Sequence, residues 1–152
     1  MLKSLSWHKI LTAPRSVQFG LNIWPPLLFA GIRVTKIDSH FRSVRVELRS
    51  NFFNRNYVGT HFGGSLYAMS DPFFMLMVMR NLNSKYYVWD QHAKIDFISP
   101  GKGTVFFNAQ ITEEDIVDIK EQTKDGKKYI KTFTAQILSK EKKIICTIEK
   151  KV

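Results

Sequence analysis

Acidic residues are scarce in this chain of 152 residues, and residues 1–37 contain none. The whole chain holds 13 Asp and Glu against 23 Lys and Arg, which gives a formal net charge of +10 at pH 7. This surplus favours anionic partners, such as nucleic acid, a membrane surface or a phosphate-bearing coenzyme. The sequence contains no RNA-recognition, zinc-finger or helix-turn-helix motif, so we expect no nucleic-acid partner.

Cysteine is also rare, with Cys146 as the single example. One cysteine excludes an intrachain disulfide, and such low usage is typical of a reducing compartment. The longest apolar run, Phe73 to Met79, is much too short to cross a bilayer as a helix. We therefore predict a cytoplasmic protein without a membrane span.

Apolar residues, in contrast, are present in sufficient number for a sizeable core. They make up 44% of the sequence and include twelve Phe and five Met. This composition excludes general disorder, and a chain of this length corresponds to a single domain over residues 1–152. Phe and Met are equally suited to packing a core and to lining a site for an apolar ligand.

Hydrophobic periodicity predicts an antiparallel sheet around one long helix, which is an α+β fold. Residues 1–30 are predicted to form a helical lead-in, interrupted at Pro14 and ended by Pro25 and Pro26. Residues 63–82 are too long and too apolar for a strand, and they predict a buried central helix with a kink at Pro72. We expect a short helix over residues 112–123 and six strands, at residues 32–37, 44–48, 86–98, 104–111, 129–138 and 143–149.

Two adjacent glycines, Gly63 and Gly64, stand at the start of the predicted central helix. A glycine pair lets another molecule approach the backbone closely. The first N–H groups of a helix lack partners within it and can bind a polarised or anionic oxygen. Asp71, the only acid of this segment, follows two turns later. The arrangement predicts an acyl-transfer site.

Four stretches of the sequence resemble a known fold. They are Asn54 to Leu66, Asp71 to Met75, Val88 to Asp90, and Ile95 to Gly101. Together with the element order they resemble the hotdog fold, in which an antiparallel β-sheet wraps around a long central helix. Within that fold they are similar to the PaaI-like acyl-CoA thioesterases, and closer still to the DUF4442 group. The likeness covers residues 15–150.

The resemblance implies catalytic positions for an Asn, a glycine turn and a helix acid. In this sequence they are Asn56, Gly63, Gly64 and Asp71. The histidine of PaaI-like thioesterases falls on Phe62, although His61 stands one residue earlier. A polar position after the helix falls near Asp90. We therefore predict four substrate-binding residues: His61, Phe62, Ser65 and Asp90.

The implied reaction is hydrolysis of an acyl thioester carried by coenzyme A or acyl carrier protein. The N–H of Gly63 or Gly64 would bind the oxyanion, and Asp71 would act as a base on water or attack directly. Asn56 would orient the water or the carbonyl. Coenzyme A enters only as part of the substrate, so we expect no cofactor, and no metal site is predicted.

Hotdog sites usually lie at a dimer interface, so the resemblance also implies a homodimer or a dimer of dimers. Gly63 and Asp71 would then serve one site from different subunits. Two other functions remain open. One is a non-catalytic hotdog protein that binds acyl-CoA or lipid, which the replacement of the family histidine by Phe62 favours. The other is a dehydratase or hydratase, with His61 and Asp71 as its acid–base pair.

Overall fold

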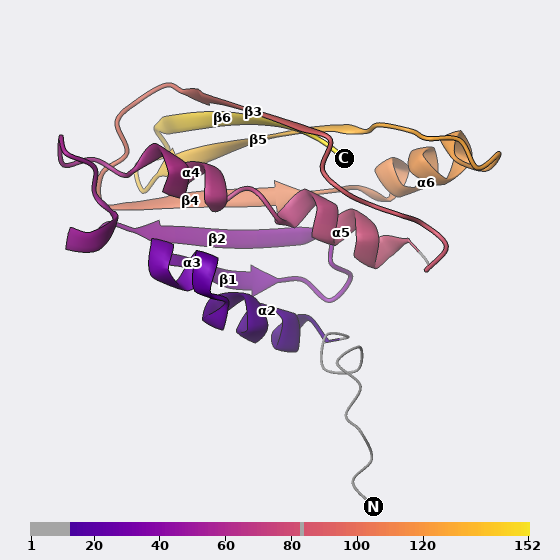
Figure 1. Ribbon diagram of the computed structural model, residues 1–152, viewed down its shortest axis with the longest axis horizontal. Coiled ribbons are helices and arrows are strands. Elements are labelled where there is room, and N and C mark those ends of the chain that lie inside the picture. Colours follow the sequence, from indigo (N-terminus) through magenta and orange to yellow (C-terminus); the bar gives the residue numbers. More distant parts are fainter. Residues whose placement is uncertain (1–12, 83) are drawn as a thin grey trace, which may run out of the picture.

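A six-stranded antiparallel sheet forms the body of the computed structural model, which describes residues 13–82 and 84–152 (Figure 1). The strand order across the sheet is β1-β2-β4-β5-β6-β3. The strands are β1 (Ile32–Ile37), β2 (Ser43–Arg49), β3 (His92–Phe97), β4 (Thr104–Gln110), β5 (Thr132–Ser139) and β6 (Ile144–Lys151).

The helices lie around this sheet, and two of them run across one of its faces (Figure 1). These two are α4 (Gly63–Ala68) and α5 (Phe73–Asn81). Beside β1 lie α2 (Pro14–Ile23) and α3 (Pro25–Ala30), α6 (Glu113–Gln122) follows β4, and a 3-10 turn, η1 (Phe52–Asn54), follows β2. No helix in residues 13–82 and 84–152 is both long and apolar enough to cross a membrane.

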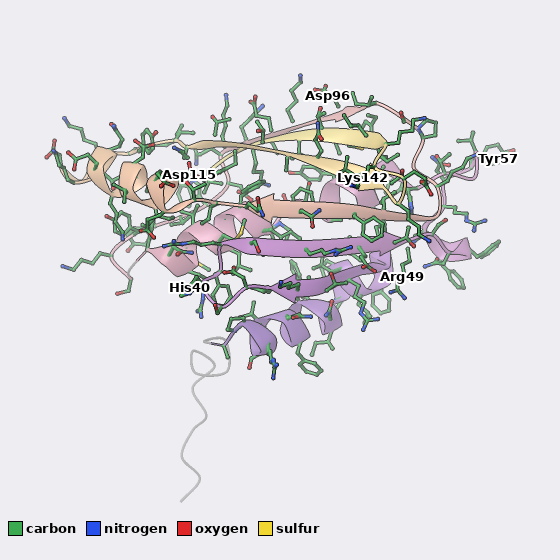
Figure 2. The ribbon with its side chains drawn as sticks, turned by 180° about the vertical axis from the view of Figure 1, so that it is seen from behind. His40, Arg49, Tyr57, Asp96, Asp115 and Lys142 are labelled. Atoms are coloured by element: carbon green, nitrogen blue, oxygen red, sulfur yellow. The ribbon has the colours of Figure 1, made fainter. Side chains whose placement is uncertain are left out.

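Alternation along the strands gives the sheet one apolar and one polar face. In β2 the buried Val44, Val46 and Leu48 alternate with residues that face outward. Polar side chains, with Asp96 among them, cover the outer face (Figure 2). The apolar face is buried against the central helix, as the predicted hotdog arrangement requires.

The central helix is anchored by aromatic packing at its second half. The ring of Phe74 stacks on Phe133 of β5 with centroids 5.0 Å apart, and it meets Phe107 of β4 edge-on. Phe73 also packs on Phe107, and both phenylalanines of α5 are fully buried. Such pairs contribute about 1 kcal/mol each beyond the apolar area that they bury.

The predicted kink at Pro72 is confirmed, because the central helix consists of two segments. Proline has no N–H, so the regular helical bonding ends before it. The backbone tightens instead into shorter turns, in which Ser70 N donates to Tyr67 O and Asp71 N donates to Ala68 O. Asp71 therefore occupies the break between α4 and α5.

Several predicted boundaries differ from the structure. The strand predicted over residues 86–98 is paired only from His92 to Phe97, because its partner β6 ends at Lys151 and leaves residues 86–90 beyond the ladder. The strand predicted over residues 129–138 begins only at Thr132. Two helices begin at proline, α2 at Pro14 and α3 at Pro25, since proline is well suited to the first helical position. The predicted lead-in before residue 13 lies outside the described residues.

The buried side chain of Asn54 joins η1 to β2 and α3. Asn54 is 4% exposed, and its Oδ1 accepts a hydrogen bond from Asn51 N at 2.8 Å. Its Nδ2 donates to Arg49 O at 2.7 Å and to Ala30 O at 3.2 Å. The side chain thereby ties the ends of β2 and α3 to η1.

We predict that Asn54→Ala lowers the free energy of unfolding by about 2–3 kcal/mol, since it leaves a buried N–H and buried carbonyls without partners. Urea denaturation of the purified protein measures the change. The matched control is Asn108→Ala on the exposed face of β4, where we expect a change of at most about 0.5 kcal/mol. Equal effects of the two substitutions would contradict the structural role of Asn54.

Candidate functional site

Asp71 contacts a lysine that the sequence analysis did not single out. Its Oδ1 accepts a hydrogen bond from Lys150 Nζ at 2.6 Å. Lys150 lies near the end of β6 with its side chain only 1% exposed, whereas the Asp71 side chain is 45% exposed. The lysine therefore fixes a carboxylate that still faces solvent.

The same ammonium group binds a second carboxylate. Lys150 Nζ lies 2.9 Å from Asp90 Oδ2, and it lies 5.5 Å from the centre of the Tyr67 ring. Three separate segments thus converge on one cation, namely the α4–α5 break, the residues before β3, and β6. We call Tyr67, Asp71, Asp90 and Lys150 the Lys150 cluster.

Burial and the contacts with Lys150 together shift the pKa values in this cluster. Burial raises the pKa of Asp90 above its ordinary value, although the Lys150 charge opposes the shift, and Asp90 Oδ1 is buried without a partner. Burial alone would lower the pKa of Lys150, but the bonds to Asp71 and Asp90 outweigh it and raise the pKa overall. Burial, together with the hydrogen bond to Asp71, raises the pKa of Tyr67. At pH 7 the lysine is charged and the tyrosine is neutral.

The glycine pair begins α4, as predicted. Within the described chain the amide groups of Gly63 and Gly64 donate to no carbonyl, because nothing precedes them in the helix. A Cβ atom on Gly63 would lie 3.2 Å from the Phe97 ring, and one on Gly64 would overlap the Phe62 ring. A side chain at either position would therefore have to displace an exposed aromatic ring.

His61 faces the turn before β4 rather than the Lys150 cluster. Its ring is 3% exposed, and Nε2 lies 2.8 Å from Gly103 O. Its backbone N–H donates to Gly101 O at 2.9 Å. Burial lowers the pKa of His61, and Nδ1 is buried without a partner. The histidine thus fastens the loop before α4 to the turn before β4.

Asn56 is likewise bonded within its loop. Its Nδ2 donates to Thr60 Oγ1 at 2.8 Å, and its Oδ1 accepts from Thr60 N at 3.0 Å and from Val58 N at 3.2 Å. Ser65 is buried in the first turn of α4, whereas Phe62 is exposed beside Gly64. The residues predicted for the site therefore form two groups, one at the start of α4 and one at the break.

Sequence reasoning missed Lys150 and Tyr67. The strand prediction ended at Glu149, two residues too early, so Lys150 was not placed in the sheet. The available signal was the position of Lys150 in the alternation of the strand. Cys146, Ile148 and Lys150 occupy every second position and all face inward from β6. A lysine at an inward position of a strand needs a partner that sequence alone does not show.

A groove of about 590 Å³ opens beside the cluster, between α5, α6 and the residues before β3. Trp89 and Gln91, the chain neighbours of Asp90, both line it. Its apolar lining includes Val78, Leu82 and Val152, and its lysines are Lys85, Lys124, Lys127, Lys128 and Lys131. Volume and lining suit an apolar ligand with an anionic group. Among the described residues no three His, Cys, Asp or Glu side chains gather to hold a metal ion.

Comparison with known protein families assigns this chain to a family. The family model of a domain of unknown function, DUF4442, matches residues 15–152. The chain belongs to the DUF4442 family. A comparison with curated proteins finds no match.

Solved structures similar to this DUF4442 chain include several thioesterases. A probable thioesterase of unknown function from Pseudomonas aeruginosa is 14% identical, with a TM-score of 0.79 over 92% of this chain and 95% of that one. A Haemophilus influenzae thioesterase is also 14% identical, with a TM-score of 0.68 over 91% and 87%. The PaaI protein of the E. coli phenylacetic acid degradation operon is 16% identical, with a TM-score of 0.61 over 89% and 87%. At these identities the likeness establishes the fold, and the predicted hotdog fold is confirmed.

The buried state of His61 predicts a pH dependence of stability. The unfolded chain takes up a proton on this ring below about pH 6.5, while the folded state resists it because the folded pKa is lowered. We expect the free energy of unfolding to fall more steeply below pH 6.5 in the wild type than in His61→Gln, which keeps a donor but does not titrate. Urea unfolding at pH 7.5, about 6.5 and about 5.5 measures both slopes. Parallel slopes would show that His61 protonates freely in the folded protein.

Proposed function

We propose that this protein hydrolyses acyl thioesters of coenzyme A or acyl carrier protein. The observation that carries the proposal is the Lys150 cluster, which holds a partly exposed carboxylate at the break of the central helix. The hotdog fold that the chain shares with thioesterases supports the same reaction class.

In this proposal Asp71 activates the attacking water. One carboxylate oxygen is held by Lys150, and the Asp71 side chain is 45% exposed, so a water molecule can reach the carboxylate. The water loses its proton to Asp71 as its oxygen bonds to the thioester carbon. The C–S bond then breaks, and the thiolate takes the proton from Asp71. Direct attack by Asp71 is the covalent variant of this reaction.

The free amides of Gly63 and Gly64 are the proposed donors to the oxyanion. Seven residues separate Gly64 from Asp71, which corresponds to about 10 Å along a helix axis. This spacing is long for a carbonyl at the glycine amides to meet a water held by Asp71 of the same protomer. This separation supports a homodimer or a dimer of dimers, in which the glycines of one protomer meet the Asp71 carboxylate of another.

The groove beside Asp90 is the proposed place for the rest of the substrate. Its apolar wall, formed by Val78, Leu82 and Val152, suits an acyl chain. Its lysines suit the phosphates of coenzyme A or of the phosphopantetheine arm. No further cofactor enters this reaction, because water is the only co-substrate.

A second candidate is binding of an acyl thioester without hydrolysis. Two observations favour it: the Phe62 ring lies against Gly64, and the polar atoms of Asn56 are all engaged inside their own loop. The dehydratase hypothesis gains no support, since His61 Nε2 is engaged by Gly103 O rather than directed at Asp71.

Thiol release from acyl-CoAs of short to long chain tests hydrolysis. We expect Asp71→Asn to lower kcat by a factor of about 100 or more, because a general base contributes at least this much. The matched control is Asp96→Asn on the outer face of β3, which should keep full activity. Binding of a non-hydrolysable thioether analogue, measured by calorimetry, should survive Asp71→Asn. Analogue binding without thiol release by the wild type would leave the binding function as the answer.

Lys150→Met tests the cluster through stability. The variant leaves two carboxylates facing each other, so we expect a loss of about 1–3 kcal/mol at pH 8, less than for a fully buried pair because Asp71 is half exposed. The folded pKa of Lys150 is raised above 10.5, so its stabilisation is complete below that pH and is lost as the pH rises further. The difference in the free energy of unfolding between wild type and variant should therefore decrease above about pH 10.5, as measured by urea unfolding. If Lys150→Met has no effect on the free energy of unfolding at pH 8, or the same effect as the exposed Lys140→Met, the cluster does not stabilise the fold.

A further inference from the structure

Three neighbouring elements expose a group of large apolar side chains to solvent. We call this group the aromatic end patch, and each member is between 47% and 90% exposed. Its members are Phe19, Ile23, Trp24, Leu28, Phe29, Phe52 and Phe53. They come from α2, α3 and η1, and the bond from Asn54 Nδ2 to Ala30 O joins η1 to the end of α3 (Figure 1). A group of this kind marks an interaction surface.

The outward orientation of these side chains is built into α2. Two polar residues of this helix, Gln18 and Asn22, face the protein, because they bond to the free edge of β1. Gln18 Nε2 donates to Val34 O and Thr35 O, while Asn22 both donates to Val34 O at 3.0 Å and accepts from Val34 N at 2.8 Å. Phe19 and Ile23 follow one position later, so they share a neighbouring face that points to solvent. α2 also packs Val17 and Leu21 against the core, so the exposed Phe19 and Ile23 form a second apolar side of this helix.

The segment of the chain that carries the patch is strongly basic. Residues 13–70 contain seven Lys and Arg but only two acids, Asp38 and Glu47. Glu47 is paired with Arg49 at 3.2 Å, and Asp38 accepts backbone N–H bonds within the turn between β1 and β2. Arg15 on α2 and Arg55 after η1 are exposed beside the aromatic residues. Figure 2 shows Arg49 near this end of the molecule as well.

We propose that the aromatic end patch docks the protein on an anionic membrane surface. Aromatic and aliphatic side chains enter the boundary between headgroups and acyl chains, while arginines bind the phosphates above them. Each basic residue near such a surface adds to the attraction. The charge pattern disfavours a second copy of this chain as the occupant, because it would bring like-charged arginines together. Docking of this kind needs no spanning helix.

Flotation of the purified full-length protein with lipid vesicles tests the proposal. We expect binding to phosphatidylcholine vesicles that contain about one third phosphatidylserine, and much weaker binding to phosphatidylcholine alone. Raising the salt from about 0.05 M to about 0.5 M should weaken binding to the anionic vesicles, since it screens the arginines.

Paired substitutions distinguish the contribution of the aromatic side chains to membrane binding from that of the arginines. Phe52→Ser combined with Phe53→Ser should lower the partition coefficient by about tenfold or more. The matched apolar control is Val117→Ser, an exposed position on α6 at the other end of the molecule (Figure 1). Arg15→Gln combined with Arg55→Gln should weaken binding and reduce its salt dependence, whereas the control Lys127→Gln should do neither. Unchanged thermal unfolding confirms that the exposed substitutions keep the fold.

Three results would overturn the proposal. The first is absence of binding to anionic vesicles by the wild type. The second is equal loss of binding in the Phe52/Phe53 variant and the Val117 control. The third is a decrease in the solution mass of the protein, measured by light scattering, in the Phe52/Phe53 variant, which would identify the patch as an interface between copies. None of these depends on thioester hydrolysis.

Discussion

The packing of α5 on the sheet is the constraint on which the rest of the structure depends. Phe73 and Phe74 fill the space above β4 and β5, and this fixes the start of α5 over the middle of the sheet. Pro72 then forces a break directly before these anchors, so Asp71 has a defined place above β6. The position of the candidate site is thus a consequence of core packing and of one missing backbone donor.

The Lys150 cluster adds an electrostatic constraint to this packing. A buried ammonium costs free energy, and only close contacts with several partners offset it. Lys150 has two carboxylates and an aromatic face, but the arrangement leaves Asp90 Oδ1 buried without a partner. Stability alone would be served as well by apolar side chains in place of the whole group of charges. The retained charges, and the raised pKa of Asp90 that burial produces, therefore favour a functional reason for the cluster.

Much of this fold could be predicted from local pattern, whereas the site could be predicted only in part. Alternation over residues 44–48 and the long apolar segment before residue 82 are local signals, and both led to the correct elements. The pairing of residues 86–98 depends on where β6 ends, which no local window contains. The same holds for His61, whose partner Gly103 lies more than forty residues away. Asp71 and the glycines stood out by type and spacing, but Lys150 needed the sheet register to be seen.

The ring of Phe62 lies beside Gly64, so its position bears directly on the choice between hydrolysis and binding. Its ring occupies the space where a side chain of residue 64 would lie, to the side of the helix. The N–H groups of the first helical turn point instead along the helix axis, toward its start. The ring therefore crowds the side-chain direction of Gly64 and not the direction of its amide. Phe62 removes a polar helper from the glycine turn, but it leaves the proposed oxyanion donors open, so hydrolysis by Asp71 and water alone remains chemically consistent with this chain.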